Sequence, residues 1–558
     1  MDPFSLTLGL ITAFKEVYAL SRCIYRACES ARASDEEREH LRKILRFELL
    51  SVQSFGRRYL KKEIIIGDAG LDIHWASLIC EVFEDLRKTL NDYRKLDDPF
   101  YKQWSPYANE KFYGTDTIEL PLDETIPPAV IPGKKLTLGS IFFTRAKETA
   151  AAAGKSAKWA LYDKKKLETT VRAFQTETEK LRGYLPLAQS AQLFRIEDKM
   201  GTLSETIRDH DANVLGLVKH AELLKLNEKD ESDFNNANEM RDCNVKIESS
   251  DSELSSGTVE FVREGSCEAD AESVMIELKH YPPTDDGAEG PDPDTEVNVR
   301  RLAALLKISA SGTRELRTLP FKYYVHQPKE ERYAFVFGYP LHAQQTQPQS
   351  LYELIKSSLQ EKRFSLGTRF QVAKAIAQSI GSFHADGWVH KSVCSQSVVF
   401  FKDRTTKSLM LESPYLVDFG YSRPEEGRTY ARSYQATNRS TLYLHPDRPR
   451  MTFTKLHDVY ALGVVLLEIA TWKVARDHFE SAIGNLDRAT AEINKEEVRE
   501  KFESIARRSI PYHMGVAYME AVVACLDDTF RGQTGTAEFV GIFQSEVIDK
   551  LSAKQLVL

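Results

Sequence analysis

The spacing of apolar residues changes once along this chain of 558 residues, and that change predicts how the chain is organised. Up to about residue 226, apolar residues recur every three or four positions, as in amphipathic helices. A polar stretch follows, and beyond it come short apolar and aromatic runs at residues 274–276, 322–325 and 333–337. Long helical patterns return from Gly367 onward. The sequence therefore predicts a multidomain protein, with an N-terminal all-α helical bundle and a C-terminal α+β fold.

Five segments of the N-terminal part are expected to be helical: residues 4–27, 34–52, 71–96, 146–181 and 193–226. Amphipathic helices of this length need one another to bury their apolar sides, so we expect them to pack as a bundle. A loop rich in proline and glycine separates the third helix from the fourth, from about residue 99 to 139. Pro186 is expected to end or interrupt the fourth helix, because proline lacks a backbone N–H.

The domain boundaries follow from where large apolar residues become rare. The stretches KDESDFNNANE and ESSDSELSSG, between about residues 227 and 257, are polar and are typical of a mobile linker. We therefore place the helical bundle at residues 1–205, a polar linker at 206–257 and the α+β domain at 258–548.

Composition restricts the classes of function. The formal net charge of -7 gives no overall basic field, so it does not support binding of nucleic acid. The seven cysteines are odd in number and form no CxxC pair or Cys/His cluster at zinc spacing, which predicts reduced thiols in an intracellular protein. The N-terminus is a poor secretory signal, and no run of about 18 apolar residues occurs. We expect a cytoplasmic protein, and recruitment to a membrane on activation is compatible with this.

Four motifs follow one another in the C-terminal part: Tyr415-Leu-Val-Asp-Phe-Gly420, Leu444-His-Pro-Asp447, the apolar stretch that begins at Asp458, and Arg531. Their order and spacing resemble those of protein kinases over about residues 258–548. The resemblance implies a bilobal kinase-like fold in which Asp418, followed by Phe419 and Gly420, binds magnesium. It also implies an ion pair between Asp447 and Arg531, and a central buried helix that starts at Asp458.

The segment from His390 to Ser397 stands where kinases have the pattern H-R-D-L-x-x-x-N. His390 aligns with the pattern and Lys391 follows it, but Ser392 replaces the aspartate that accepts the proton of the substrate hydroxyl. Ser397 replaces the asparagine that binds the second metal ion. A neutral hydroxyl cannot take up a proton near neutral pH, so the loop holds no intact catalytic residue. The sequence favours a pseudokinase, and an atypical active kinase that uses another base is the alternative.

The nucleotide side of the kinase pattern is degraded too. No G-x-G-x-x-G precedes the strand predicted at 274–279. The resemblance implies that Lys279 contacts nucleotide and pairs with Glu296, on a helix capped near Asp292; the alternative is a surface lysine and a helix-start glutamate. Asp418 favours weak binding of ATP with magnesium, and the alternative is a structural acid left by descent. The sequence leaves both outcomes open, no cofactor or ATP with magnesium.

Two motifs in the N-terminal part, Met1-Asp-Pro-Phe-Ser-Leu-Thr-Leu-Gly-Leu-Ile11 and Lys158-Trp-Ala-Leu-Tyr-Asp-Lys-Lys-Lys166, are similar to motifs of fungal HeLo domains. That family occurs in heterokaryon-incompatibility and prion-inhibition proteins. The resemblance covers residues 1–205 and implies a helical bundle whose N-terminal segment is released to permeabilise membranes and kill the cell. The membrane segment is expected to present Phe4, Leu8, Ile11, Phe14 and Val17. The alternative is that this helix packs in the bundle core.

Together these resemblances predict a non-catalytic signalling effector of programmed cell death or heterokaryon incompatibility, in which the pseudokinase controls the helical bundle. The expected partners are an upstream activator, further copies of the chain, and membrane lipid through the N-terminal helix. Phosphorylation between residues 429 and 437 is a candidate trigger, because its hydroxyls lie among Arg428 and Arg432. A two-domain scaffold that only binds proteins is a further alternative, and it predicts no membrane activity.

Overall fold

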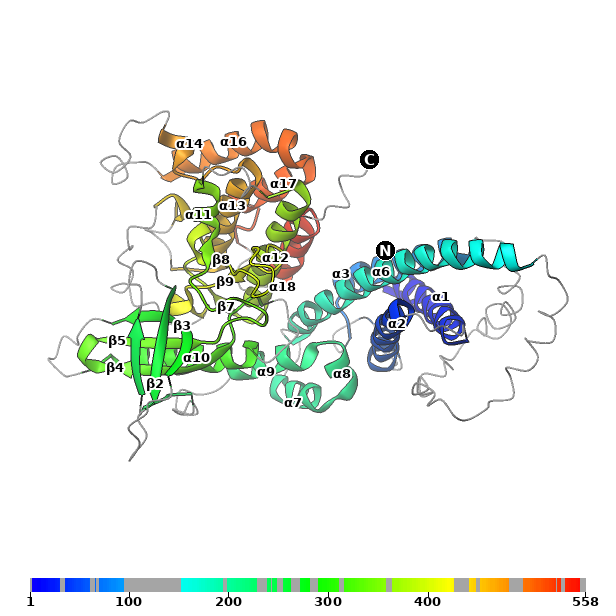
Figure 1. The fold of residues 1–558 in the computed structure, drawn as a ribbon, viewed down its shortest axis with the longest axis horizontal. Coiled ribbons are helices and arrows are strands. Elements are labelled where there is room, and N and C mark those ends of the chain that lie inside the picture. The colour runs from blue at the N-terminus through cyan, green and yellow to red at the C-terminus, as the bar shows by residue number, and fades with distance from the viewer. Residues whose placement is uncertain are drawn as a thin grey trace. The chain divides into compact units, whose positions relative to one another are not determined.

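The chain folds into two compact units, Met1–Val218 and Lys219–Leu558 (Figure 1). The computed structural model describes residues 3–30, 36–60, 66, 70–94, 152–193, 198–227, 238–241, 243–247, 254–261, 271–281, 290–310, 316–357, 364–425, 441–447, 452–480, 495–527, 529–532 and 537–551. Three features discussed above lie outside the described residues: the loop at 99–139, the candidate trigger segment at 429–437, and the side chains at 158–165.

The first unit is built from helices, as predicted: α1 (Pro3–Ser30), α2 (Glu36–Phe55), the π-helical turn η1 (Gly56–Leu60), α3 (Ile73–Arg94), α6 (Ala152–Leu193), α7 (Lys199–Arg208) and α8 (His210–Val214). Helix α9 (Leu217–Asn227) crosses the division between the two units. α1 and α6 each pack against both α2 and α3. The expectation that Pro186 ends or interrupts the fourth helix is wrong, because α6 continues through it to Leu193.

An aromatic cluster forms the centre of the first unit. Phe14 of α1, Phe55 of α2 and Phe83 of α3 are all fully buried. Their ring centroids lie 5.0 to 6.1 Å apart. Gly56 permits this packing, because a Cβ at that position would lie 2.4 Å from Cζ of Phe14. Helices far apart in the sequence thus share one core, which explains the helical spacing of the apolar residues.

A buried ion pair joins α2 to α6. The Glu48 carboxylate accepts hydrogen bonds from the Thr178 hydroxyl and the Arg182 guanidinium, each at 2.6 Å. Arg182 also donates to the Ser51 hydroxyl at 2.9 Å. Because a buried carboxylate is costly to leave unpaired, these bonds fix how the two helices face each other.

The predicted membrane segment on α1 falls into two parts. Phe4 and Leu8 are 78% and 57% exposed, whereas Phe14 and Val17 are fully buried in the core and Ile11 is half-buried. The C-terminal part of the segment therefore packs inside the unit, and its first two turns present apolar side chains to solvent. Within the described ranges, no helix combines the length and apolar character needed to cross a membrane.

The second unit begins with an antiparallel sheet of five strands in the order β1-β2-β3-β5-β4. They are β1 (Cys243–Ile247), β2 (Leu254–Phe261), β3 (Ala271–His280), β4 (Phe321–Gln327) and β5 (Arg332–Phe337). Helix α10 (Pro293–Ala310) connects β3 to β4 and packs on β4. β1 and the start of β2 lie inside residues 206–257, which the sequence predicted to be a polar linker, so that linker prediction is wrong for these strands.

The sheet is curled, because the stretch of chain that pairs with β4, one outer strand, runs on directly into β1, the other outer strand. The backbone N–H of Met240 donates to the Tyr324 carbonyl on β4 at 2.8 Å, and the Tyr324 N–H donates to the Asn238 carbonyl at 2.9 Å. Three residues later, β1 pairs with β2 at the other end of the strand order. A cluster of small apolar side chains fills the enclosed face, and it includes Val259, Val274, Ile276, Val325, Ala334 and Val336.

The rest of the second unit is mainly helical: α11 (Leu351–Lys356), α12 (Leu366–Ala385), α13 (Lys455–Thr471), α14 (Asp477–Glu480), α16 (Lys495–Met514), α17 (Val516–Leu526), α18 (Ala537–Phe543) and the π-helical turn η9 (Gln544–Ile548). Two small sheets join it, β6-β8-β9 (Gln349–Ser350, Val398–Phe400, Tyr415–Leu416) and β7-β10 (Trp388–Val389, Arg423–Pro424). The short helical turns are η3 (Pro328–Glu330), η5 (Ser395–Ser397), η6 (Phe419–Tyr421) and η8 (Thr441–Tyr443). A sheet followed by helices agrees with the predicted α+β class.

Candidate functional site

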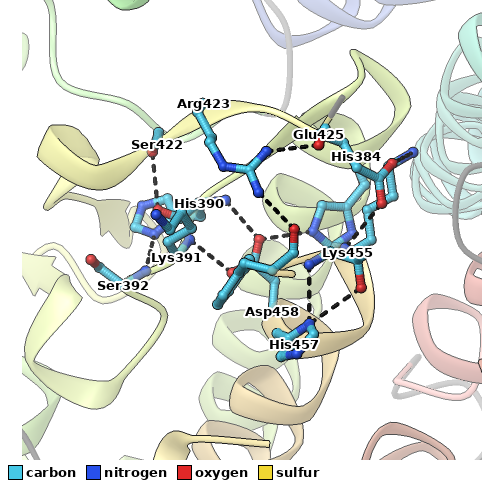
Figure 2. A network of polar contacts seen from close by, with 12 residues as sticks. His384, His390, Lys391, Ser392, Ser422, Arg423, Glu425, Lys455, His457 and Asp458 are labelled. Atoms are coloured by element: carbon cyan, nitrogen blue, oxygen red, sulfur yellow. Dashed lines mark hydrogen bonds and ion pairs between the residues drawn. The ribbon is translucent and has the colours of Figure 1, made fainter. Parts of the chain in front are cut away.

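The site is organised around Asp458, whose carboxylate lies at the start of α13 and is 1% exposed. Figure 2 shows this carboxylate facing the backbone of His390 and Lys391 and the ring of His384. The backbone N–H groups of His390 and Lys391 donate to it at 2.6 and 2.9 Å, and His384 Nε2 lies 3.2 Å away. Burial raises the pKa of Asp458, but these hydrogen bonds and the neighbouring imidazoles outweigh it and hold the pKa below its ordinary value. A buried carboxylate thus fixes the loop at residues 390–397, for which the sequence predicted a degraded catalytic motif.

The His390 ring packs in the protein interior and is fully buried. Its centroid lies 4.7 Å from that of Phe419 and 6.0 Å from that of Phe383, both in edge-to-face arrangements. Burial lowers the pKa of His390 to about 4, so the ring is neutral near pH 7. The Ser422 hydroxyl donates to the His390 carbonyl at 3.2 Å. This histidine therefore links the loop to the segment that contains Phe419.

Ser392 and Ser397, which the resemblance to kinases placed at catalytic positions, take part in local turns. The Ser392 backbone N–H donates to His390 Nδ1 at 3.3 Å. The buried Ser397 hydroxyl donates to the Cys394 carbonyl at 2.9 Å and accepts from the Cys394 N–H at 3.0 Å. Both positions thus present neutral hydroxyls, and that of Ser397 is engaged in closing η5.

A second polar network holds β10 to the start of α13 (Figure 2). The Arg423 guanidinium donates to the carbonyls of Pro424, Glu425 and Phe453 at 2.6, 2.7 and 2.8 Å. Lys455 Nζ lies 2.9 Å from the Glu425 carboxylate, and the pair is largely buried. The segment that enters at β10 is therefore anchored to the helix that carries Asp458.

Strand β3 contacts the segment around Asp418 through two side chains. The Glu277 carboxylate, which is 3% exposed, accepts from the backbone N–H groups of Asp418 and Phe419 at 2.8 and 2.9 Å. Lys279 Nζ donates to the Gly420 carbonyl. Burial lowers the pKa of Lys279 to about 8. Glu277 was not predicted as a site residue; the only signal was a carboxylate at an otherwise apolar strand position.

The structure does not bring together the predicted pair of Lys279 and Glu296. Glu296 pairs with Arg300, one turn further along α10, and Lys279 is engaged by Gly420. The first turn of α10 is capped as predicted, because the Asp292 carboxylate accepts from the Thr295 N–H at 2.9 Å. The helix was thus placed correctly, whereas the partner of the lysine was not.

Asp447 and Arg531 form the ion pair that the sequence predicted, with 2.9 Å between Arg531 Nη2 and Asp447 Oδ2. The Arg531 side chain is half exposed, so solvent screens the attraction. The pair joins the segment after η8 to the segment that precedes α18.

A buried carboxylate on α13, Glu468, is linked to η5 through Tyr443. It accepts from the Tyr443 hydroxyl at 2.8 Å and from the Ala475 N–H at 2.6 Å. The Tyr443 hydroxyl also lies 2.9 Å from the Ser395 hydroxyl of η5. Burial raises the pKa of Glu468 to about 7, and these hydrogen bonds only partly oppose the rise.

We expect Glu468→Gln to make the unfolding free energy of the second unit less dependent on pH. The ordinary pKa of a glutamate carboxyl is 4.5, and burial raises the pKa of Glu468 to about 7 in the folded chain. The contribution of this carboxyl group to the free energy of unfolding is fully present below pH 4.5 and is lost as pH rises through 7. The loss is on the order of 3 kcal/mol. Glutamine does not titrate, so the variant gains stability relative to wild type between pH 5 and 8. Urea unfolding of the full chain at several pH values measures this, and a difference that stays constant with pH contradicts it.

A further buried pair lies at the end of α12, where the sequence gave no signal. His220 Nδ1 of α9 lies 2.7 Å from the carboxylate of Asp386, and both side chains are fully buried. Asp386 caps α12 two residues before β7. Helix α9 is thus anchored at the base of the strand that leads into His390.

The described residues contain no group of three or more histidine, cysteine, aspartate or glutamate side chains placed to hold a metal ion. Of the residues predicted to bind nucleotide or metal, Asp418 is buried and its backbone is left-handed, with φ at 73°. Lys279 and Asp418 are the two residues that the resemblance to kinases assigns to a nucleotide with magnesium.

Comparison with known proteins gives limited likenesses. A family model described as a domain of unknown function (DUF7580) matches residues 289–536. The chain is 27% identical over 134 residues to the LRR receptor-like serine/threonine-protein kinase ERL1 of Arabidopsis thaliana. It is 28% identical over 134 residues to the LRR receptor-like serine/threonine-protein kinase ERECTA of the same plant. Each alignment covers 23% of this chain and 13% of the relative, so the likeness to kinases is weak and partial.

Proposed function

We propose that the second unit is a kinase-like bilobal domain without catalytic activity, that is, a pseudokinase. The order of its elements supports this: Lys279 lies on the third strand, α10 follows, and the motifs at 390–397, 418–420 and 458–463 come in the kinase order. The partial likeness to two plant kinases favours the same class.

The observation that carries the proposal is the hydroxyl at Ser392. Asp458 holds the backbone of the two residues before Ser392, so the loop is ordered at the position where a kinase has its proton acceptor. The side chain at that position is a serine and not an aspartate. A serine hydroxyl cannot accept the substrate proton near neutral pH, and such losses typically cost several orders of magnitude in rate. The loop is therefore suited to a structural role.

The residues around Asp418 do not fit a nucleotide with magnesium. Lys279, which would contact the phosphates, donates to the Gly420 carbonyl, and the buried carboxylate of Glu277 lies against the same segment. A nucleotide would have to displace the hydrogen bond between Lys279 and Gly420, and its phosphates would lie near the negative charge of Glu277.

We further propose that the first unit is a HeLo-type bundle that acts on membranes after a signal, in programmed cell death or heterokaryon incompatibility. The sequence motifs are its main support. The exposed side chains of Phe4 and Leu8 add apolar surface that is able to enter a membrane interface. Phe14 and Val17 are buried, so they reach a membrane only if α1 leaves the core. An upstream activator and self-association are the partners that this function requires.

Helix α9 supports control by the pseudokinase, because it runs from the first unit into the second and His220 anchors it against Asp386. The anchor lies within the second unit, and we propose that loosening it activates the first unit, to which α9 is joined along the chain. We would measure dye leakage from phosphatidylcholine vesicles containing phosphatidylserine, with the full chain as wild type, His220→Ala and Asp386→Asn. His513→Ala, at an exposed histidine of α16, is the matched control.

The proposal predicts that both anchor variants release dye while wild type and His513→Ala do not. Asp386→Asn preserves packing, so it tests the pair even if His220→Ala fails to fold. Anchor variants that fold and release no more dye than wild type would contradict control through α9. They would favour the protein-binding scaffold, which predicts no membrane activity.

A further inference from the structure

Two side chains on one face of β3 hold the backbone of residues 418–420. Alternate strand residues face opposite sides, and Val274 and Ile276 point into the apolar cluster of the curled sheet. Glu277 and Lys279 therefore point to the other side, toward η6, which β3 contacts. We call these two side chains and the backbone of residues 418–420 the β3 clamp.

The β3 clamp makes three hydrogen bonds, and two of them involve a largely buried anion. Both carboxylate oxygens of Glu277 are engaged, one by the N–H of Asp418 and one by the N–H of Phe419. Lys279 Nζ is engaged by the Gly420 carbonyl. Gly420 lies close to the strand, since a Cβ there would be 3.7 Å from the Leu278 carbonyl oxygen. Charge-assisted hydrogen bonds of this kind are stronger than neutral ones, so the clamp holds the segment without any ligand.

The clamp also opposes a phosphate ligand electrostatically. In kinases the β3 lysine pairs with nucleotide phosphates, and metal ions held partly by the aspartate at this position neutralise them. Here the lysine is already bound, and a buried carboxylate lies two residues away on the same face of the strand. Like charges in a poorly solvated site repel strongly, because little water screens them.

We propose that Glu277 is the residue that excludes nucleotide phosphates from this site and replaces a nucleotide in ordering residues 418–420. This inference rests on the proposed kinase-like fold of the second unit. With the Glu277 carboxylate present, the protein's own groups close the site. Without it, the site is open to an anionic ligand.

The test is a thermal-unfolding titration of the full chain with ATP and magnesium. The variants are wild type, Glu277→Gln, Glu277→Gln with Lys279→Met, and Glu272→Gln. Glu272 is a matched control, because it lies on β3 and pairs with Lys322 outside the clamp. We expect a rise in unfolding midpoint of about 2 °C or more for Glu277→Gln with nucleotide at about ten times its dissociation constant. We expect no rise for wild type or Glu272→Gln, and loss of the rise when Lys279→Met is added.

Two results of the titration would overturn the inference. One is a rise in wild type as large as that in Glu277→Gln, and the other is no rise in Glu277→Gln. Phosphate transfer by the wild-type chain would instead overturn the proposed function, so the two failures are distinguishable.

Hydrogen exchange gives a second readout that needs no ligand. Glutamine offers only one acceptor oxygen where the carboxylate offered two, so one amide of the pair Asp418 and Phe419 loses its partner. We expect the peptide spanning residues 415–421 to contain an amide that exchanges about tenfold faster or more in Glu277→Gln. Exchange in Glu272→Gln should match wild type. Unchanged exchange in Glu277→Gln would overturn the clamp itself.

Discussion

Replacing Asp458 with alanine is expected to lower the unfolding free energy of the second unit by about 3 to 5 kcal/mol. The change removes the acceptor of two backbone N–H groups and leaves the His384 ring without that contact, all in a fully buried setting. A buried N–H group without a hydrogen-bond acceptor lowers the stability of the fold by its full desolvation free energy. Urea unfolding of the full chain, followed by circular dichroism, measures the change.

Asp477→Ala is the matched control for Asp458. Its carboxylate lies 2.7 Å from Lys356 Nζ in a partly exposed ion pair of the same unit. Removal of such a pair is expected to change the unfolding free energy by about 1 kcal/mol or less. If both variants lost the same amount, Asp458 would not be the residue that organises the loop.

Phe14→Ala is expected to destabilise the first unit by about 3 to 5 kcal/mol, because it opens a cavity between α1, α2 and α3. Phe4→Ala on the same helix should change the free energy of unfolding by about 0.5 kcal/mol or less, since Phe4 is mostly exposed. The comparison, made by urea unfolding of the full chain, separates the core part of the predicted membrane segment from its exposed part. Equal losses in the two variants would contradict the placement of Phe14 in the core.

The helices of the first unit were predictable because local spacing reports directly on which side is buried. Phe14 and Val17 lie in the core as the helical period requires, and the alternative of a packed helix holds for them. The exposure of Phe4 and Leu8 could not be predicted, because it depends on where the neighbouring helices end. Pro186 failed as a helix end, since packing of α6 on α2 and α3 outweighs one lost hydrogen bond.

Strand β1 was missed although its sequence carries a signal. Cys243, Val245 and Ile247 alternate with polar residues and pack against the sheet core. The polar composition on both sides outweighed this short alternation in the prediction. Its pairing with β2 is a tertiary contact, and no local rule specifies it.

The candidate site was predicted best where a motif fixes both partners. The ion pair of Asp447 and Arg531 is present in the structure. It could be predicted because the resemblance to kinases named both residues. The partners of Glu277 are backbone groups 141 and 142 positions away, and His220 meets Asp386 across 166 positions. A single sequence does not predict contacts to backbone groups or contacts between residues so far apart in the chain.

The most direct test of the central claim, that the second unit is not a catalyst, is transfer of labelled phosphate from ATP. The full chain is incubated with γ-labelled ATP and magnesium or manganese, with a general protein substrate, as wild type and as Asp418→Ala. The account predicts no labelling of either protein by wild type above the level of Asp418→Ala, because Ser392 offers no proton acceptor and Lys279 is bound to Gly420. Labelling by wild type that disappears in Asp418→Ala would contradict it.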